Sequence, residues 1–137
     1  MNELNPELPK ILVIDDDPIS VRVLCELFKR RYQVSWASDG CDGLVLAQET
    51  LPDLILLDVL LPGIDGYEVC RRLRVGSATA DIPVIFLTAM ADAAGLDQGF
   101  EVEGPDYLCK PFDFRELLAR VSTRILSRQA KRSKELV

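Results

Sequence analysis

Acidic and hydroxyl side chains directly follow three short apolar runs of this chain, and a lysine follows a fourth short segment. The groups are Asp15, Asp16 and Asp17 after residues 11–14, Asp58 after 54–57, Thr88 after 84–87, and Lys110 after 106–109. If these segments are parallel strands of one sheet, their carboxyl ends meet at one edge. Carboxylates, a hydroxyl and an ammonium in one cleft suit a divalent cation and a phosphoryl group.

Strand-length apolar runs alternate with segments of helical periodicity, which predicts a βα repeat around a parallel sheet. The predicted strands cover residues 11–14, 33–36, 54–57, 83–87 and 107–109. The polar alternation of 33–36 predicts an edge strand, whereas 54–57 is apolar throughout and should be buried on both faces. We predict one helix that begins at Pro18, a second over about 42–50, a third that follows Asp65 and ends near residue 75, a weak fourth over 91–101, and a fifth that follows Asp113. We expect Leu51 and Phe114 to face inward.

Composition limits the classes of function. The 137 residues carry a net charge of −6 with a pI near 4.7, which argues against a nucleic-acid-binding surface. No apolar run approaches membrane-spanning length, so we expect a soluble cytoplasmic protein that binds neither nucleic acid nor membrane directly. Four widely spaced cysteines and no histidine argue against a zinc site. We expect a disordered tail over 1–9, a folded domain over 10–127, and a basic helical extension or linker over 128–137.

Four sequence motifs together resemble the receiver domain of two-component response regulators. They are the opening Ile-Leu-Val-Ile-Asp-Asp-Asp-Pro at 11–18, Leu-Asp at 57–58 with Leu-Pro-Gly-Ile-Asp-Gly at 61–66, Leu-Thr-Ala at 87–89, and Asp-Tyr-Leu-Cys-Lys-Pro-Phe at 106–112. Their order and spacing cover about residues 10–127. The resemblance implies a doubly wound, flavodoxin-like (βα)5 fold with strand order 2-1-3-4-5, and a switch controlled by phosphorylation.

The resemblance also implies roles around the phosphoryl group. Asp58 is the expected phosphoacceptor, and its donor is a histidine of a sensor kinase or phosphotransfer protein. Lys110 and Thr88 are expected to contact the phosphate oxygens, and the Ala89 backbone N–H is a further donor. Such a domain is not an enzyme beyond accepting its own phosphoryl group and slowly hydrolysing it. The Lys110–Pro111 peptide is expected to be cis.

A magnesium ion is the cofactor that the resemblance implies. Asp16, Asp58 and the backbone carbonyl of Leu60 correspond to the direct protein ligands, while Asp15 holds a metal-bound water. Mg²⁺ prefers octahedral oxygen ligands and keeps several waters, which agrees with this donor set.

The expected switch couples Thr88 to Tyr107. Pulling Thr88 toward a phosphate leaves space behind it, into which the Tyr107 ring could rotate. The face made by residues 91–101, the strand at 107–109 and the last helix would then change its contacts. We expect this face to act on an output domain, beyond Val137 or in a separate protein, or to form a homodimer.

Two other functions remain open at this stage. A haloacid-dehalogenase-type phosphatase would use Asp15 and Asp17, but it needs a late acidic pair that this sequence lacks. A receiver-like interaction domain that does not use phosphate is the third hypothesis, and the complete acid, threonine and lysine set argues against it. We expect Asp17 to cap a helix, Asp106 only to shape a turn, and Asp53 to be a loop residue without chemistry.

Overall fold

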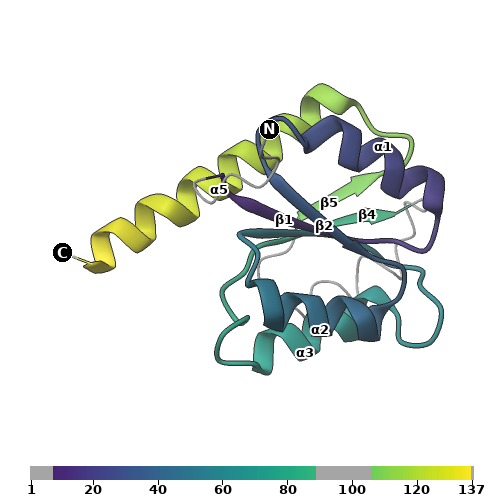
Figure 1. The fold of residues 1–137 in the computed structure, drawn as a ribbon, viewed down its shortest axis with the longest axis horizontal. Helices are drawn as coiled ribbons and strands as arrows, with labels where there is room; N and C mark the ends of the chain where they lie inside the picture. The colour runs from purple at the N-terminus through teal and green to yellow at the C-terminus, as the bar shows by residue number, and fades with distance from the viewer. Residues whose placement is uncertain (1–7, 89–105, 137) are drawn as a thin grey trace, which may run out of the picture.

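Five parallel strands form one sheet in the order β2-β1-β3-β4-β5 (Figure 1). The computed structural model describes residues 8–88 and 106–136. The strands are β1 (Lys10–Ile14), β2 (Gln33–Ala37), β3 (Leu54–Asp58), β4 (Val84–Thr88) and β5 (Asp106–Cys109). The predicted strand order, the parallel sheet and the edge position of β2 are confirmed.

Helices cover both faces of the sheet. They are α1 (Pro18–Phe28), α2 (Gly40–Thr50), α3 (Gly66–Val75) and α5 (Phe114–Leu136). α1 and α5 lie on one face, and α2 and α3 on the other (Figure 1). Alternate residues of a strand point to opposite faces. In β3, Leu54 and Leu56 therefore join the core under α1 and α5, while Ile55 and Leu57 join the core over α2 and α3.

Aspartates fix the beginnings of three helices. Asp17 accepts a hydrogen bond from the Ile19 N–H at 3.0 Å, Asp39 from Asp42 at 2.8 Å, and Asp65 from Glu68 at 2.9 Å. Each bond satisfies one backbone donor that the first helical turn leaves unpaired. The predicted cap at Asp17 and the proline at the first position of α1 are confirmed.

Two residues predicted to face inward are exposed instead. Leu51 ends α2 in a left-handed conformation with φ 48°, and its side chain is 48% exposed. Phe114 is also 48% exposed, because it begins α5 beside the loop that follows β5 rather than over the sheet. At these two helix ends, helical periodicity therefore predicts a buried side chain where the structure has an exposed one.

The last helix is long and leaves the body of the domain. α5 spans 23 residues, and its C-terminal part projects beyond the edge of the sheet (Figure 1). In the described part of the chain, no helix is both long and apolar enough to cross a membrane. Residues 1–7 of the expected tail, the helix predicted over 91–101 and Ala89 lie outside the described residues.

Candidate phosphoacceptor site

Three carboxylates meet at the carboxyl edge of the sheet. Asp15 and Asp16 follow β1, and Asp58 is the last residue of β3. One oxygen from each lies within 4.8 Å of one oxygen of the others. Asp15 is buried, Asp58 is half-buried and Asp16 is exposed, so the cluster opens to solvent on one side. Three convergent carboxylate oxygens with an open side fit a hard cation such as Mg²⁺, which keeps some of its waters.

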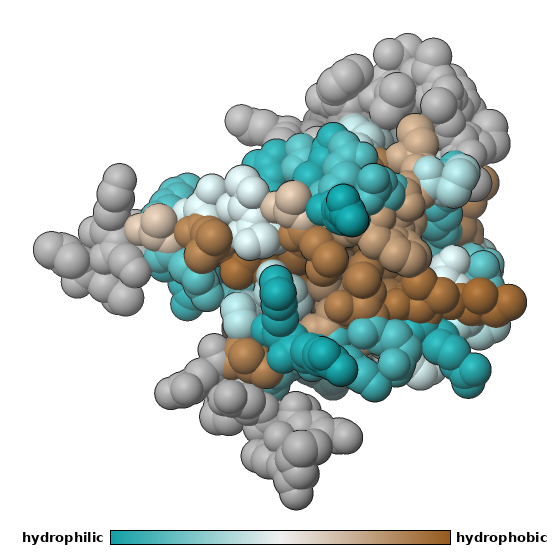
Figure 2. Space-filling view, turned by 90° about the horizontal axis from the view of Figure 1, so that it is seen from above, coloured by the Kyte–Doolittle hydropathy of each residue, from teal (hydrophilic) through white to brown (hydrophobic). Residues whose placement is uncertain are grey.

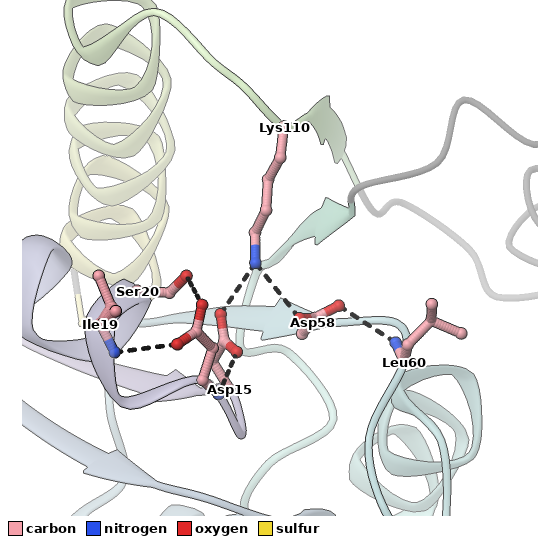
Figure 3. A network of polar contacts seen from close by, with 7 residues as sticks. Asp15, Ile19, Ser20, Asp58, Leu60 and Lys110 are labelled. Atoms are coloured by element: carbon pink, nitrogen blue, oxygen red, sulfur yellow. Dashed lines mark hydrogen bonds and ion pairs between the residues drawn. The ribbon is translucent and has the colours of Figure 1, made fainter.

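Lys110 crosses this edge and binds two of the carboxylates. Its ammonium lies 3.0 Å from Asp15 Oδ2 and 3.3 Å from Asp58 Oδ2 (Figure 3). The lysine directly follows β5, and its backbone N–H donates to the Thr88 carbonyl at 2.6 Å. The Lys110–Pro111 peptide is cis, as expected. Strand pairing thus places the lysine opposite the acids.

Burial and charge act in opposite directions on the ionisable groups. Burial raises the pKa of Asp58, and the nearby Lys110 ammonium and the Leu60 N–H oppose this shift. Burial lowers the pKa of Lys110, but its hydrogen bonds and charge interactions with Asp15 and Asp58 outweigh burial and leave that pKa raised. Lys110 is therefore a fixed positive charge at neutral pH.

Backbone N–H groups orient the carboxylates. Asp15 Oδ1 accepts from the Asp17 N–H at 2.9 Å, and Asp58 Oδ1 accepts from the Leu60 N–H at 3.1 Å. Asp17 is not one of the clustered carboxylates, and its oxygens accept from the Ile19 N–H and the Ser20 hydroxyl. A phosphatase that uses Asp15 and Asp17 together finds no support in this geometry.

Thr88 and Tyr107 belong to the neighbouring strands β4 and β5, in which Tyr107 pairs with Phe86 and Thr88 with Cys109. Thr88 ends β4 and is buried. The Tyr107 ring stacks on Phe86 with centroids 5.1 Å apart and an interplanar angle of 20°. The Tyr67 ring also packs on Phe86, with centroids 5.1 Å apart and a tilt of 54°. The Tyr107 hydroxyl is buried and makes no well-formed hydrogen bond among the described residues. The Tyr107 side chain is therefore in an inward position here.

The model of the response regulator receiver domain matches residues 11–122. The chain belongs to this family. The DNA-binding dual master transcriptional regulator RpaA of Synechocystis is 50% identical over 126 residues, which cover 91% of this chain and 52% of that protein. The response regulator PleD of Caulobacter vibrioides is 45% identical, over 82% of this chain and 25% of its own length. The receiver therefore spans about half of the first relative and less of the second.

Solved structures agree with this assignment. A response regulator of Chloroflexus aurantiacus superposes with a TM-score of 0.79 at 39% identity, over 88% of this receiver and 99% of that chain. A second structure is the receiver domain of the sensor histidine kinase PA1611 from Pseudomonas aeruginosa, solved with magnesium in its active-site cleft. It superposes with a TM-score of 0.80 at 30% identity, over 86% of this chain and 98% of that chain. The flavodoxin-like fold expected from the sequence is confirmed.

The receiver also contains a strong contact that the sequence did not suggest. Arg124 of α5 donates to both oxygens of Asp106, with both distances 2.7 Å. Asp106 was expected only to shape a turn, and this expectation is wrong, because its carboxylate joins β5 to the last helix. The sequence feature that could have indicated this contact is the series of arginines at every fourth position of that helix.

The inward Tyr107 predicts an unusual titration. Burial first, and then the neighbouring Tyr67 phenol, raise the pKa of Tyr107 to about 12. Because an unfolded tyrosine titrates near 10, the folded state binds more protons between these values, and stability should fall as pH rises from about 10 to about 12. NMR of the tyrosine ring carbons against pH would measure this pKa, with Tyr107→Phe giving the assignment. A Tyr107 pKa near 10 would show an outward ring.

Proposed function

We propose that this receiver accepts a phosphoryl group on Asp58 from a phosphohistidine of a partner kinase or phosphotransfer protein. The observation that carries this proposal is the Lys110 ammonium held between Asp15 and Asp58. An oxygen of Asp58 bonds to phosphorus while the P–N bond to the donor imidazole breaks, and that electron pair stays on the imidazole nitrogen. A carboxylate can approach a phosphoryl group only where positive charge offsets both negative partners.

The same carboxylates would hold the magnesium ion. We assign Asp16, Asp58 and the Leu60 carbonyl as direct ligands, with Asp15 holding a bound water. When bound, the ion neutralises charge that develops on the phosphoryl oxygens. The magnesium in the related PA1611 receiver supports this assignment. The acids are the part of the site that is fixed in advance, since backbone N–H groups and Lys110 already orient two of them.

Three groups would bind the phosphate once it is attached. Lys110 and Thr88 donate to its oxygens, and the Ala89 N–H, outside the described residues, is a third donor. Moving Thr88 toward the phosphate favours the inward Tyr107, which then packs on Phe86 as it does in this structure. Phosphorylation would therefore stabilise an existing conformation rather than create a new one.

An apolar surface beside the site fits a protein donor. Figure 2 looks onto the layer of α1 and α5, where an apolar band crosses the surface. Next to Lys110, Ile19 (72% exposed), Val23 and Phe114 line a hollow of about 260 Å³. Exposed apolar residues around a reactive group are typical of a contact surface for a partner protein. We propose that the phosphohistidine protein binds here.

Covalent labelling tests the proposed function. With Mg²⁺ and acetyl phosphate, the intact chain should gain the mass of one phosphoryl group. Reducing the acyl phosphate with borohydride should convert Asp58 alone to homoserine, which peptide mass spectrometry locates. Labelling of another aspartate would contradict Asp58 as the phosphoacceptor. Continuous turnover of acetyl phosphate without a labelled protein would contradict the proposed function and indicate a phosphatase activity.

A second donor separates chemistry from docking in the same experiment. A phosphorylated histidine kinase core that labels the wild-type chain should label Ile19→Ser about tenfold more slowly, because central apolar contacts dominate such interfaces. Acetyl phosphate, which has no protein surface, should label this variant within about twofold of wild type. Val75→Ser, an exposed residue of α3, is the control. Equal slowing with both donors would contradict the proposed docking surface, whereas the proposal that Asp58 is the phosphoacceptor would stand.

The wider role follows from the family and is part of the proposal. This chain covers only 52% of the DNA-binding regulator RpaA and 25% of PleD. We therefore infer that an output domain, beyond Val137 or in a separate protein, responds to Asp58. Because a histidine kinase takes its phosphoryl group from ATP, we also propose that the receiver acts in the cytoplasm. Slow loss of the phosphoryl group by hydrolysis would reset it. Sedimentation with and without beryllium trifluoride would test homodimerisation through the face that includes β5 and α5.

A further inference from the structure

Four arginines occur at every fourth position of α5, at residues 120, 124, 128 and 132. Residues four apart lie above one another on one side of a helix. This row faces the amino-terminal edge of the sheet, opposite the phosphoacceptor edge, as its partners show. We refer to it as the arginine row.

The first two arginines of the row hold β5. Arg120 donates to the backbone carbonyl of Tyr107 at 3.2 Å. Arg124 binds the Asp106 carboxylate with two parallel hydrogen bonds of 2.7 Å. Paired charged hydrogen bonds of this kind are among the strongest side-chain contacts and fix direction as well as distance. α5 is therefore attached to Asp106 and Tyr107, the first two residues of β5.

The third arginine holds the segment that precedes β3. Arg128 Nη1 lies 3.2 Å from the Pro52 carbonyl and 3.2 Å from Asp53 Oδ1. The Arg128 and Asp53 side chains are each 19% exposed. Asp53 is itself fixed, since its other oxygen accepts from the Lys10 N–H at 2.8 Å. Arg132 reaches Asp53 only at 3.8 Å and is 62% exposed.

Apolar packing of α5 ends before Arg128. Ile125 is the last residue of α5 with a buried side chain among those described, and Leu126 is 61% exposed. Between 126 and 132, Arg128 alone is not exposed. Beside it lies a hollow of about 780 Å³, lined by α5 and by residues at the amino-terminal edge of the sheet, among them Lys10, Asp53 and Pro83. Among the described residues, this part of the helix is therefore held by polar contacts rather than by packing.

We propose that Arg124 and Arg128 form a clamp that sets the direction in which α5 leaves the domain. The C-terminal part of α5 projects beyond the sheet, so the angle at which the helix leaves the domain determines where its end lies (Figure 1). Because Arg124 binds Asp106, next to Tyr107, the clamp also ties this angle to β5. This second part rests on the proposed function, whereas the clamp itself does not.

Hydrogen exchange followed by mass spectrometry tests the clamp on the unphosphorylated chain. In Arg128→Ala, amides of residues 127–132 should exchange about tenfold faster, because a charged, half-buried contact is lost at a place without packing. Arg132→Ala is the matched control, one turn further along, and should change exchange by less than about twofold. Arg128→Lys should restore little, since a single ammonium cannot reproduce the guanidinium contacts. Equal exchange in Arg128→Ala and wild type would overturn the clamp.

A second arm tests the connection to the switch. Adding Mg²⁺ and beryllium trifluoride, a phosphate mimic, should change exchange of 127–132 in wild type by at least about twofold. Arg124→Ala should lose this response while peptides around Asp58 still become protected. If peptides around Asp58 do not respond in wild type, the proposed function is contradicted. The clamp is then still tested by the hydrogen exchange of Arg128→Ala. If they respond and 127–132 does not, the connection is overturned. Unchanged far-UV circular dichroism confirms that each variant is folded.

Discussion

Lys110→Ala should slow phosphorylation of Asp58 by acetyl phosphate about 100-fold or more, while the site still binds Mg²⁺. In the described part of the chain, Lys110 supplies the one ammonium in contact with the clustered carboxylates, at 3.0 and 3.3 Å. Losing one preorganised donor at a site of developing charge typically costs 10²–10³ in rate. Magnesium binding should survive or tighten, because the variant removes a positive charge that competes for the same oxygens.

Two measurements on each variant make this result specific. Timed intact-mass spectra give the phosphorylation rate. Trp36, the single tryptophan, lines a hollow together with Asp15 and Asp16, so its fluorescence can report Mg²⁺ binding. Asp58→Asn sets the unlabelled baseline, and Lys29→Ala, an exposed lysine paired with Glu26, controls for the loss of charge. If Lys110→Ala loses Mg²⁺ binding together with labelling, the lysine organises the acids rather than binding the phosphate.

The strands and the site could be predicted because both depend on local pattern. The run at 54–57 is apolar at every position, and the structure divides it between two cores, as a central parallel strand requires. Once parallel strands are recognised, the residues that follow them must share one edge. Asp15, Asp58 and Lys110 are therefore brought together by topology, although 95 residues separate the first from the last.

Other features depend on contacts that the local pattern does not contain. The Arg124–Asp106 pair depends on the angle between α5 and β5, and the Arg128–Asp53 pair joins residues 75 apart in the chain. Leu51 follows the periodicity of α2, yet it adopts the left-handed conformation that ends the helix. Side-chain partners at an edge and the conformation of a terminal residue are set by the assembled fold. The repeat of arginines showed that α5 has a polar row, but not what the row binds.

Gly66→Ala should destabilise the domain by about 3 kcal/mol and displace the phosphoacceptor. Gly66 begins α3, and an added Cβ would clash with the backbone carbonyl oxygen of Asp58 and lie 2.9 Å from Val59 Cα. The Gly66 N–H also donates to the Val59 carbonyl at 2.8 Å, so the two segments cannot separate freely. Overpacking against backbone is costly because neighbouring atoms cannot rotate away. Urea unfolding followed by circular dichroism would measure the loss.

Gly63→Ala is the matched control for this substitution. It lies three residues earlier, in the loop that precedes α3, and has φ +75°; among the described residues, an added Cβ would meet no atom within 4 Å. Its cost should be only the left-handed backbone strain of an alanine, about 1 kcal/mol. The difference between the two variants therefore isolates the close approach of α3 to Asp58. If Gly66→Ala costs no more than Gly63→Ala and is labelled at the wild-type rate, α3 can move aside, and its packing does not position the phosphoacceptor.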